Sequence, residues 1–316
     1  MSFVYLFPGQ SSRYPEMLER ASLMAPREAS LILERASDVL GHDVRARFAR
    51  PDPFERNSDV QLAVFLTTQI HLRALEHAGV RAVRSLGLSL GEYSHLVHAG
   101  ALELDEALRL IAARGSAYDE GPRGAMASIF PLPLEAIEPL VERARDKGAL
   151  EVTGYNSPTQ HVVSGDEPAL RTLEALLDEE EPGSAFVWIE RSVPMHAWFF
   201  RPAADRFRPA LEAASFACPR LPYLPNVLGT SLADPKRSTL VDLLYQHVFR
   251  PVLFRQSIEH LAAVEPGAVF VEVGPRGVLA GLLRRWQKTM VHKTDGEEGD
   301  PSRAFEGLLE ELDRAA

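Results

Sequence analysis

The feature that most constrains the fold is a Gly-x-Ser-x-Gly segment at residues 87–91, between a strand-like run and a helical pattern. The run Val83–Leu88 predicts a strand, and apolar spacing after it predicts a helix to about Ala99. Two glycines around one serine let the backbone turn sharply and pass close to that helix. The turn would expose the Ser89 hydroxyl and aim the Leu90 amide at the same point. A purely structural turn has the same pattern, but the strand–helix context favours a nucleophile.

Strands and helices alternate along most of the chain, which indicates an α/β fold built on a mainly parallel sheet. Short apolar runs predict further strands at 3–7 and 269–273. Helical spacing predicts helices at 59–78, 104–118 and 279–288, and helical character from residue 196 to about 214. The polar, glycine-bearing segment 294–302 is expected to be a flexible link to a short C-terminal helix.

Residues 124–193 have a different pattern of predicted strands and helices and are expected to form an inserted small domain. The predicted order is strand 125–130, helix 133–147, strands 150–155 and 160–164, helix 167–179 and strand 185–193. This β-α-β-β-α-β order is that of a ferredoxin-like unit. The expected division is therefore a large domain of residues 1–123 and 194–316, interrupted by a small domain of residues 124–193.

Charge and cysteine content exclude several classes of protein. A net charge of −10 argues against a general affinity for nucleic acid. The single cysteine, Cys218, excludes a disulfide framework and a multi-cysteine metal site, and it fits a reducing cytoplasm. No stretch approaches the roughly 20 apolar residues of a membrane span. We therefore expect a cytoplasmic protein without a metal site, a nucleic-acid partner or a membrane association.

A nucleophilic serine needs a base, and ten histidines are available. His95 and His98 lie on the helix that follows Ser89, where helical geometry points them away from the serine hydroxyl. His196 follows a strand-like run that ends at Val193, and the ends of parallel strands are where α/β proteins assemble their sites. Spacing alone does not decide among the histidines, but it favours His196.

Six motifs resemble those of the malonyl-CoA:acyl carrier protein transacylases and the acyltransferase domains of polyketide synthases, including the discrete trans-acting type. The resemblance runs from Phe3 to about Lys288, and its motifs occur in the order and spacing of that family. They are Phe7–Ser12, Gly87–Glu92, Arg114-Gly115 with Gly124–Ala127, Asn156–Gln160, Ser192–His196 and Gly274–Leu279.

The resemblance implies a role for each matching residue. They are Ser89 as nucleophile, His196 as base, the Gln10 and Leu90 amides as oxyanion donors, Arg114, Asn156 and Met195 as substrate-binding residues, and the Leu253 carbonyl as the group that orients the histidine. Without the motif, Arg114 would be interpreted as a surface salt-bridge residue on a helix, and Asn156 as an ordinary turn residue. An arginine is suited to the free carboxylate of a malonyl unit because its guanidinium binds carboxylates bidentately.

The family also implies an α/β-hydrolase-like large domain with a ferredoxin-like insert. It implies no bound cofactor, an acyl-CoA as donor, and the phosphopantetheine thiol of an acyl carrier protein as acceptor. A carrier protein is acidic, and the expected docking patch is Arg276, Arg284, Arg285 and Lys288, although these could equally be a solvated helix face.

The departures from the family pattern leave the acyl group open. Leu88 stands where the family has histidine, Ser11 and Arg13 replace glycine and glutamine, and Tyr118-Asp119 replaces Met-Gln. Trp198 and Met195 flank the expected base in a segment that follows acyl selectivity in the family. A bulkier acyl group passed between carrier proteins, a hydrolase that clears acyl chains from carrier proteins, and a non-catalytic carrier-binding scaffold are the alternatives.

Overall fold

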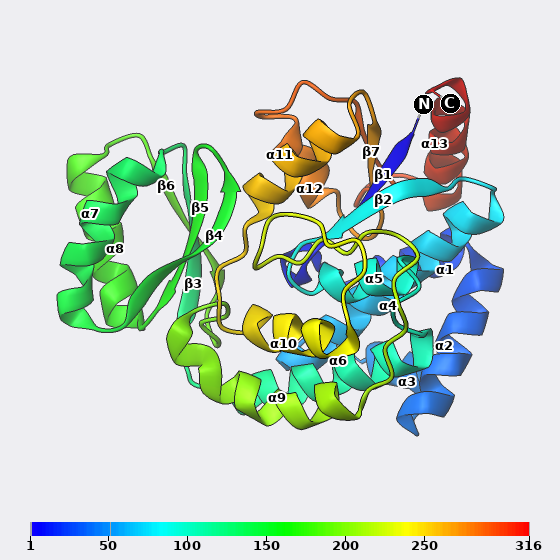
Figure 1. The fold of residues 1–316 in the computed structure, drawn as a ribbon, viewed down its shortest axis with the longest axis horizontal. Helices are drawn as coiled ribbons and strands as arrows, with labels where there is room; N and C mark the ends of the chain where they lie inside the picture. Colours follow the sequence, from blue (N-terminus) through cyan, green and yellow to red (C-terminus); the bar gives the residue numbers. More distant parts are fainter. Residues whose placement is uncertain (1, 51, 316) are drawn as a thin grey trace.

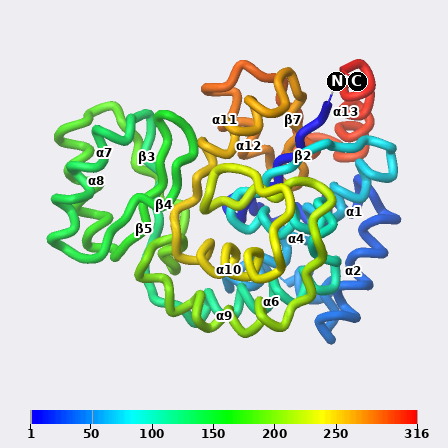
Figure 2. The backbone as a smooth tube through the Cα atoms, viewed as in Figure 1, coloured from blue at the N-terminus to red at the C-terminus, as the bar shows by residue number. Residues whose placement is uncertain are grey.

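The computed structural model describes residues 2–50 and 52–315, which fold around two β-sheets (Figures 1 and 2). The first sheet is parallel and has the strand order β2-β1-β7-β8. Its strands are β1 (Phe3–Phe7), β2 (Ala82–Gly87), β7 (Val269–Glu272) and β8 (Val291–Lys293). The expected α/β fold with a parallel sheet is therefore present, beside a second sheet that is antiparallel.

Strand β1 lies inside the parallel sheet and is buried on both faces, as its continuous apolar sequence predicts. Val4 and Leu6 pack into a cluster with residues of α11 (Phe254–Val264) and α12 (Val278–Leu283). Tyr5 and Phe7 point to the opposite face and join the larger cluster with α4 (Asn57–His77), α5 (Gly91–His98) and α6 (Leu104–Asp119). Helices on both faces thus hold the C-terminal end of β1 in a fixed position.

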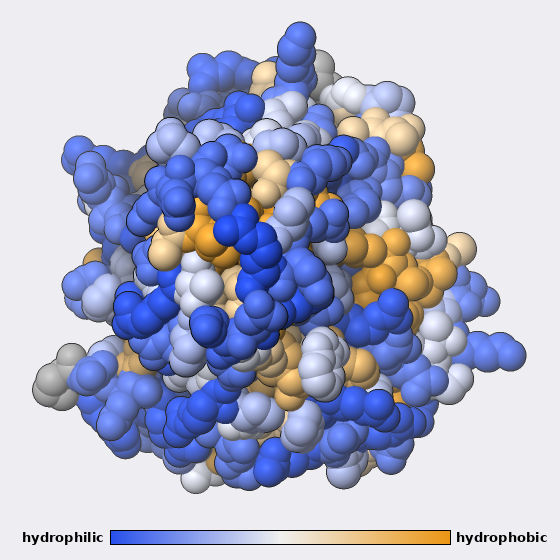
Figure 3. Space-filling model, turned by 90° about the vertical axis from the view of Figure 1, so that its left-hand side faces the viewer, coloured by the Kyte–Doolittle hydropathy of each residue, from blue (hydrophilic) through white to orange (hydrophobic). Residues whose placement is uncertain are grey.

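The second sheet is formed within residues 125–190, and its order is β4-β5-β3-β6. The chain runs through β3 (Ala125–Phe130), α7 (Leu134–Ala144), β4 (Leu150–Ser157), β5 (Gln160–Gly165), α8 (Glu167–Glu180) and β6 (Ala185–Glu190). Helices α7 and α8 cover the outer face of this sheet (Figure 1) and share a separate apolar core with it. The exterior of this part of the molecule is mostly hydrophilic (Figure 3).

The other face of the second sheet turns toward the parallel sheet (Figure 1), and backbone hydrogen bonds join the two parts. Tyr155 N donates to the Val252 carbonyl at 3.0 Å, and Val252 N donates to the Thr153 carbonyl at 2.9 Å. Strand β4 is therefore attached to the segment that precedes α11.

The remaining elements surround these two parts. They are α1 (Met17–Met24), α2 (Pro26–Leu40), α3 (Val44–Phe48), α9 (Arg201–Ala213), α10 (Arg237–His247) and α13 (Pro301–Ala315), with short 3-10 helices at η1 (Gln10–Ser12), η2 (Arg145–Lys147) and η3 (Trp198–Phe200). Within the described residues, none of the helices has the length and apolar character that crossing a bilayer would require.

Two helices begin or end differently from their predictions. Helix α12 ends at Leu283, before the predicted end at residue 288, and the backbone continues in turns in which Arg285 N and Trp286 N bond carbonyls three residues back. Helix α9 begins only at Arg201. The 3-10 helix η3 lies directly before it, and η3 in turn follows a turn that contains His196, where φ is +64°.

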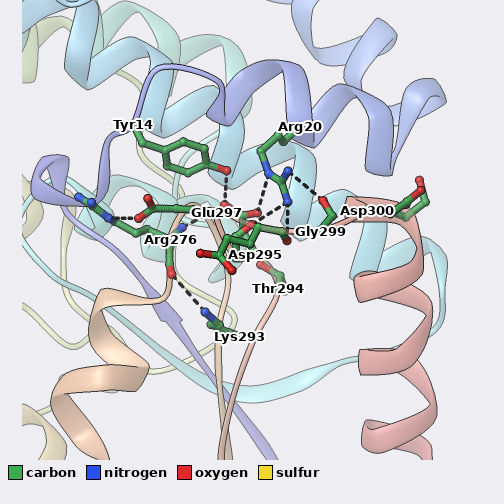
Figure 4. A network of polar contacts seen from close by, with 12 residues as sticks. Tyr14, Arg20, Arg276, Lys293, Thr294, Asp295, Glu297, Gly299 and Asp300 are labelled. Atoms are coloured by element: carbon green, nitrogen blue, oxygen red, sulfur yellow. Dashed lines mark hydrogen bonds and ion pairs between the residues drawn. The ribbon is translucent and has the colours of Figure 1, made fainter.

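The segment before α13 is fastened to the molecule, so the expectation of a flexible link is wrong (Figure 4). Arg20 of α1 donates to the carbonyls of Gly296, Glu298 and Gly299. Asp295 is buried and accepts from the Tyr14 hydroxyl at 2.6 Å and from the Arg276 amide at 3.0 Å. Polar composition predicted mobility here, whereas carbonyls and a carboxylate that meet buried donors produce order.

Candidate active site

The turn at residues 87–91 connects β2 to α5 and holds its serine in a strained backbone conformation. Ser89 has φ of +52°, a left-handed region that few non-glycine residues adopt. Both glycines are required by space: a Cβ added to Gly91 would lie 2.1 Å from the Phe7 carbonyl oxygen, and one added to Gly87 would lie 2.0 Å from the carbonyl carbon of Gly91. Helix α5 therefore approaches β1 closely, and Ser89 is left lining a cleft at the end of the sheet.

The structure brings Ser89 and His196 together, although they lie far apart in the sequence. Ser89 Oγ is 2.8 Å from His196 Nε2. On the other side of the ring, His196 Nδ1 is 2.7 Å from the His247 carbonyl oxygen. Because a carbonyl can only accept, Nδ1 carries the proton and the Nε2 lone pair faces the serine hydroxyl. This is the tautomer that can remove a proton from Ser89.

The expectation that the Leu253 carbonyl orients the histidine is wrong. That carbonyl accepts from Ser257 N at 3.0 Å and from Ser257 Oγ at 2.9 Å. Leu253 precedes the first turn of α11, where a carbonyl begins the intrahelical bonds. His247 is the last residue of α10, where helical carbonyls lose their intrahelical partners and are free to accept from another group.

The Gln10 and Leu90 backbone amides are available for a ligand at this turn. Neither donates to an acceptor within residues 2–50 and 52–315. The loop of Gln10 packs against the serine turn, since a Cβ added to Gly9 would lie 3.0 Å from the Leu88 carbonyl oxygen and 3.7 Å from Ser89 Cβ. Gln10 and Ser89 line the same cleft. Two free amides beside a serine hydroxyl are the donors that an oxyanion requires.

His196 is held in its neutral form. Burial and, to a smaller extent, the positive charge of Arg114 lower its pKa to about 3, against the opposing effect of the His247 and Arg250 carbonyls. At neutral pH the imidazole is therefore uncharged and able to accept a proton.

Arg114 lies on α6 and is fully buried, so the alternative of a surface salt bridge is wrong. Its guanidinium stacks 4.2 Å from the Tyr118 ring centroid and 5.6 Å from that of Tyr93. Nη1 donates to Gln61 Oε1 at 2.6 Å, whereas Nε and Nη2 have no acceptor among the described residues. A buried guanidinium with two free donors is costly unless an anion completes it. Its enclosed side chain does not line the cleft of Ser89.

The cleft itself lies between the two sheets, with an empty volume of about 610 Å³ that includes its open mouth. Asn156 and Met195 line it together with Ser89 and His196. The second sheet contributes Met126, Thr153, Gly154, Val162, Ile189 and Glu190, and Leu88 lies beside the serine. Most of the wall is apolar, which suits an acyl chain.

A second groove continues outward from this cleft. The two share Ser11, Leu88, Asn156, Val162 and Ile189 as lining residues. The outer groove extends to Arg276 and Arg285 at the surface. Arg276 is ion-paired with Glu297, and Arg284 donates to the Val291 carbonyl at 2.8 Å. The Arg285 guanidinium lies over the Phe130 ring and donates to Gln160 Oε1 at 3.5 Å.

Three residues that contribute to this site, Asn226, Glu92 and His247, were not identified from the sequence. Asn226 Oδ1 accepts from Ser89 N at 2.7 Å, and Asn226 Nδ2 donates to the Gly87 carbonyl at 2.6 Å. Glu92 and His247 lie behind them, both fully buried. Asn226 comes from an irregular segment without a recognisable motif, so no signal indicated it. Glu92 could have been noticed as a carboxylate in the first turn of the helix that follows the nucleophile.

No metal site accompanies this arrangement in the part of the chain that the structure describes. No group of three or more His, Cys, Asp or Glu side chains there is placed to hold an ion.

Comparison with known proteins identifies the family of the chain. The Acyl transferase domain family matches residues 4–299. The malonyl CoA-acyl carrier protein transacylase of Escherichia coli K12 is 31% identical over 311 residues, covering 96% of this chain and 99% of the relative. The crystal structure of the transacylase of the same name from Clostridium perfringens has a TM-score of 0.88 at 28% identity and covers 99% of this chain and 98% of its own. A complex of a type II polyketide synthase acyl-carrier protein with its malonyl-transacylase has a TM-score of 0.87 at 26% identity, over 98% of this chain and 100% of the other. The chain belongs to the acyl transferase domain family.

Proposed function

We propose that this protein transfers a malonyl group from coenzyme A to the phosphopantetheine thiol of an acyl carrier protein through an acyl-serine at Ser89. The observation that carries the proposal is the 2.8 Å contact between Ser89 Oγ and His196 Nε2. Both groups line one cleft beside two unbonded amides. Family membership and the similarity to transacylases of that substrate class support the same conclusion.

In the first half-reaction, His196 Nε2 takes the proton of the Ser89 hydroxyl as Oγ attacks the thioester carbonyl. The Gln10 and Leu90 amides donate to the oxyanion that forms. When the carbonyl re-forms, the carbon–sulfur bond breaks and the coenzyme A thiolate takes the proton from His196. The acyl group then remains on Ser89 as an ester.

In the second half-reaction, His196 takes the proton of the phosphopantetheine thiol, and the thiolate attacks the acyl-serine. The same amides stabilise the second oxyanion. Its collapse breaks the ester bond, and Ser89 recovers its proton from His196. One histidine therefore serves both halves, and the proposed cycle requires no bound cofactor.

Arg114 is the group that we assign to the free carboxylate of the malonyl unit. Its buried position and the unpaired Nε and Nη2 support a ligand that is anionic and planar. Asn156 and Met195 are assigned to the wall of the acyl cleft. Because the enclosed guanidinium does not line the cleft, this assignment requires the packing between the two to open when the acyl group binds.

The finer description of the fold is part of the same proposal. Residues 1–123 and 194–316 are assigned to an α/β-hydrolase-like domain and residues 124–193 to a ferredoxin-like domain. The β-α-β-β-α-β order and the strand order of the second sheet support the latter assignment. The proposed role includes an acyl-CoA as the donor and an acyl carrier protein as the partner. It also places the protein in the reducing cytoplasm. Nucleic acid and membranes are not among the proposed partners.

Docking of the acidic carrier protein is assigned to the mouth of the outer groove. Arg285 and Lys288 are the stronger candidates of the predicted patch, because both are exposed and neither is ion-paired among the described residues. Arg276 is neutralised by Glu297, and Arg284 donates to a backbone carbonyl. From Arg285 the groove leads inward to the cleft of Ser89. Such a path is suited to a phosphopantetheine arm, which must reach the buried serine while its carrier protein remains outside.

Intact mass after exposure to malonyl-CoA tests the reaction. We expect a malonyl adduct on the wild-type protein, none on Ser89→Ala, and release of the adduct when a phosphopantetheinylated carrier protein is added. In Arg114→Ala we expect the malonyl adduct to form more than 100-fold more slowly, while acetyl loading is spared. Failure of every acyl-CoA to label the wild-type protein would remove the proposed enzyme. Rapid loss of the adduct to water without a carrier protein would favour the hydrolase, and labelling by bulkier acyl groups alone would favour transfer between carrier proteins.

A further inference from the structure

Behind His196 lies a buried histidine that the reaction cycle above does not use. The His247 carbonyl orients His196, but the His247 imidazole is itself fully buried, with its centroid 5.1 Å from that of His196. Neither of its ring nitrogens has a hydrogen-bond partner in the described chain. A carboxylate lies close to this ring: Glu92 Oε2 is 3.5 Å from His247 Nδ1.

Glu92 is connected to the nucleophile as well as to this histidine. It is fully buried, accepts from the Tyr223 hydroxyl, and accepts from Asn226 N at 3.1 Å. The side chain of Asn226 in turn holds the Ser89 amide at 2.7 Å and the Gly87 carbonyl at 2.6 Å. One carboxylate thus contacts the residue that fixes the strained serine turn and the residue whose carbonyl fixes the base.

The reaction cycle creates a charge that this carboxylate is placed to offset. When His196 accepts the Ser89 proton it becomes an imidazolium, in a buried site that already contains the Arg114 cation. Among the described residues, no carboxylate hydrogen-bonds or ion-pairs with His196 directly. An uncompensated buried charge is expensive, so the site needs a negative charge close to the ring.

We propose that Glu92 is a positioning residue that acts on Ser89 through Asn226 and on His196 through the His247 imidazole. With the Glu92 carboxylate 3.5 Å from its Nδ1, the His247 ring is held by electrostatic attraction at the end of α10, which fixes the direction of its carbonyl. The ionised carboxylate also favours the imidazolium of His196 across the intervening ring. This inference rests on the proposed acyl transfer, because it assigns a function to Glu92 within that cycle.

The charge state of Glu92 makes the inference measurable. Burial raises its pKa to about 7, opposed by the bonds from Tyr223 and Asn226 and by the charge of Arg114. The titratable and charged groups near the pair are Arg114 of α6, Tyr93 and His95 of α5, Tyr223, and His196. Below pH 7 the carboxyl is protonated and its effect is lost, whereas above pH 7 the effect is present. The rate of Ser89 acylation should therefore rise between about pH 6 and pH 8.

Glu92→Gln removes the charge and keeps the size and an acceptor oxygen. Glu272→Gln is the matched control, because Glu272 is also fully buried and its pKa is likewise raised to about 7, yet it bonds the Ala280 amide and lines neither the cleft nor the outer groove. The measurement is single-turnover acylation by malonyl-CoA, followed by intact mass from pH 5 to pH 9, with thermal unfolding of each variant.

For Glu92→Gln we expect acylation at pH 8 to fall about 10- to 100-fold, less than the roughly 10⁴-fold that follows loss of an acid bonded directly to a catalytic histidine. The malonyl-CoA concentration for half-maximal rate should stay unchanged, and the rise near pH 7 should disappear. Glu272→Gln should keep both the rate and the rise. His247→Gln, which retains the backbone carbonyl, should lose the same rise, and the double variant should be little slower than Glu92→Gln alone.

An unchanged acylation rate and pH profile in a folded Glu92→Gln protein would overturn the inference. So would a slower acylation rate that still rises near pH 7 in this variant. If Glu92→Gln fails to fold, His247→Gln decides, because a normal pH profile in that variant leaves the carboxylate without its route to His196. If the wild-type protein takes up no acyl group at all, it is the proposed function that fails.

Discussion

The two sheets reach the cleft in different ways. The parallel sheet contributes backbone: the strained Ser89, the free amides of Gln10 and Leu90, and glycines with no space for a side chain. The antiparallel sheet contributes side chains, such as Met126 and Val162, that line the same cleft from β3 and β5. Reactive atoms are thus fixed by main-chain geometry, while the shape of the acyl site depends on residues that could change without moving the main chain.

The largest effect should come from breaking the main-chain geometry. In Gly91→Ala the new methyl group would meet the Phe7 carbonyl at 2.1 Å, so α5 must move away from β1. We expect a loss of about 3 kcal/mol or more in the free energy of unfolding, together with loss of Ser89 acylation. Chemical denaturation and intact mass with malonyl-CoA measure the two effects.

Gly307→Ala provides the control for that substitution. Gly307 lies in α13 with nothing within 4 Å of an added Cβ, so alanine should leave stability unchanged or raise it by up to about 1 kcal/mol. If Gly91→Ala and Gly307→Ala proved equally stable, the serine turn would have room for a side chain, and the contrast between the two sheets would fail.

The same contrast explains what the sequence could predict. The serine turn was recognisable because its steric demands require glycine at fixed positions. His196 was recognised by the resemblance of Ser192–His196 to a family motif, because the strand before it is the antiparallel β6, which ends at Glu190. The carbonyl that orients His196 was assigned to Leu253 rather than His247, because any residue type can supply a carbonyl and only the end of α10 frees this one. Asn226 carried no signal either, since its irregular segment is positioned by tertiary contacts.

An intermediate effect should follow from reshaping the acyl wall on the second sheet. Val162 of β5 lines both the cleft and the outer groove, whereas the next residue, Val163, points to the opposite face into the core beneath α7 and α8. Val162→Ala should raise kcat/KM for methylmalonyl-CoA relative to malonyl-CoA by about 10-fold, because one added methyl group is worth that much in an apolar pocket.

Val163→Ala on the same strand separates selectivity from stability. It should cost about 1–3 kcal/mol of folding free energy by leaving a cavity, and leave the ratio of the two kcat/KM values unchanged. A selectivity change in Val163→Ala that matches that of Val162→Ala would contradict the assignment of the two faces of β5.

The smallest effect on the acylation rate should come from the contact between the second sheet and the residue before His196. Ser164 of β5 is fully buried, donates to the Met195 carbonyl at 2.9 Å and lies 2.6 Å from Thr153 Oγ1. Ser164→Ala leaves that carbonyl without its donor one residue before His196, so we expect a loss of about 1–2 kcal/mol in stability and a fall of a few-fold in the acylation rate. Thr172→Ala, which removes an exposed hydroxyl from α8 in the same part of the molecule, should change neither. A normal acylation rate in Ser164→Ala, measured beside a normal Thr172→Ala, would mean that His196 takes its position from α10 alone and that the second sheet serves only to shape the acyl site.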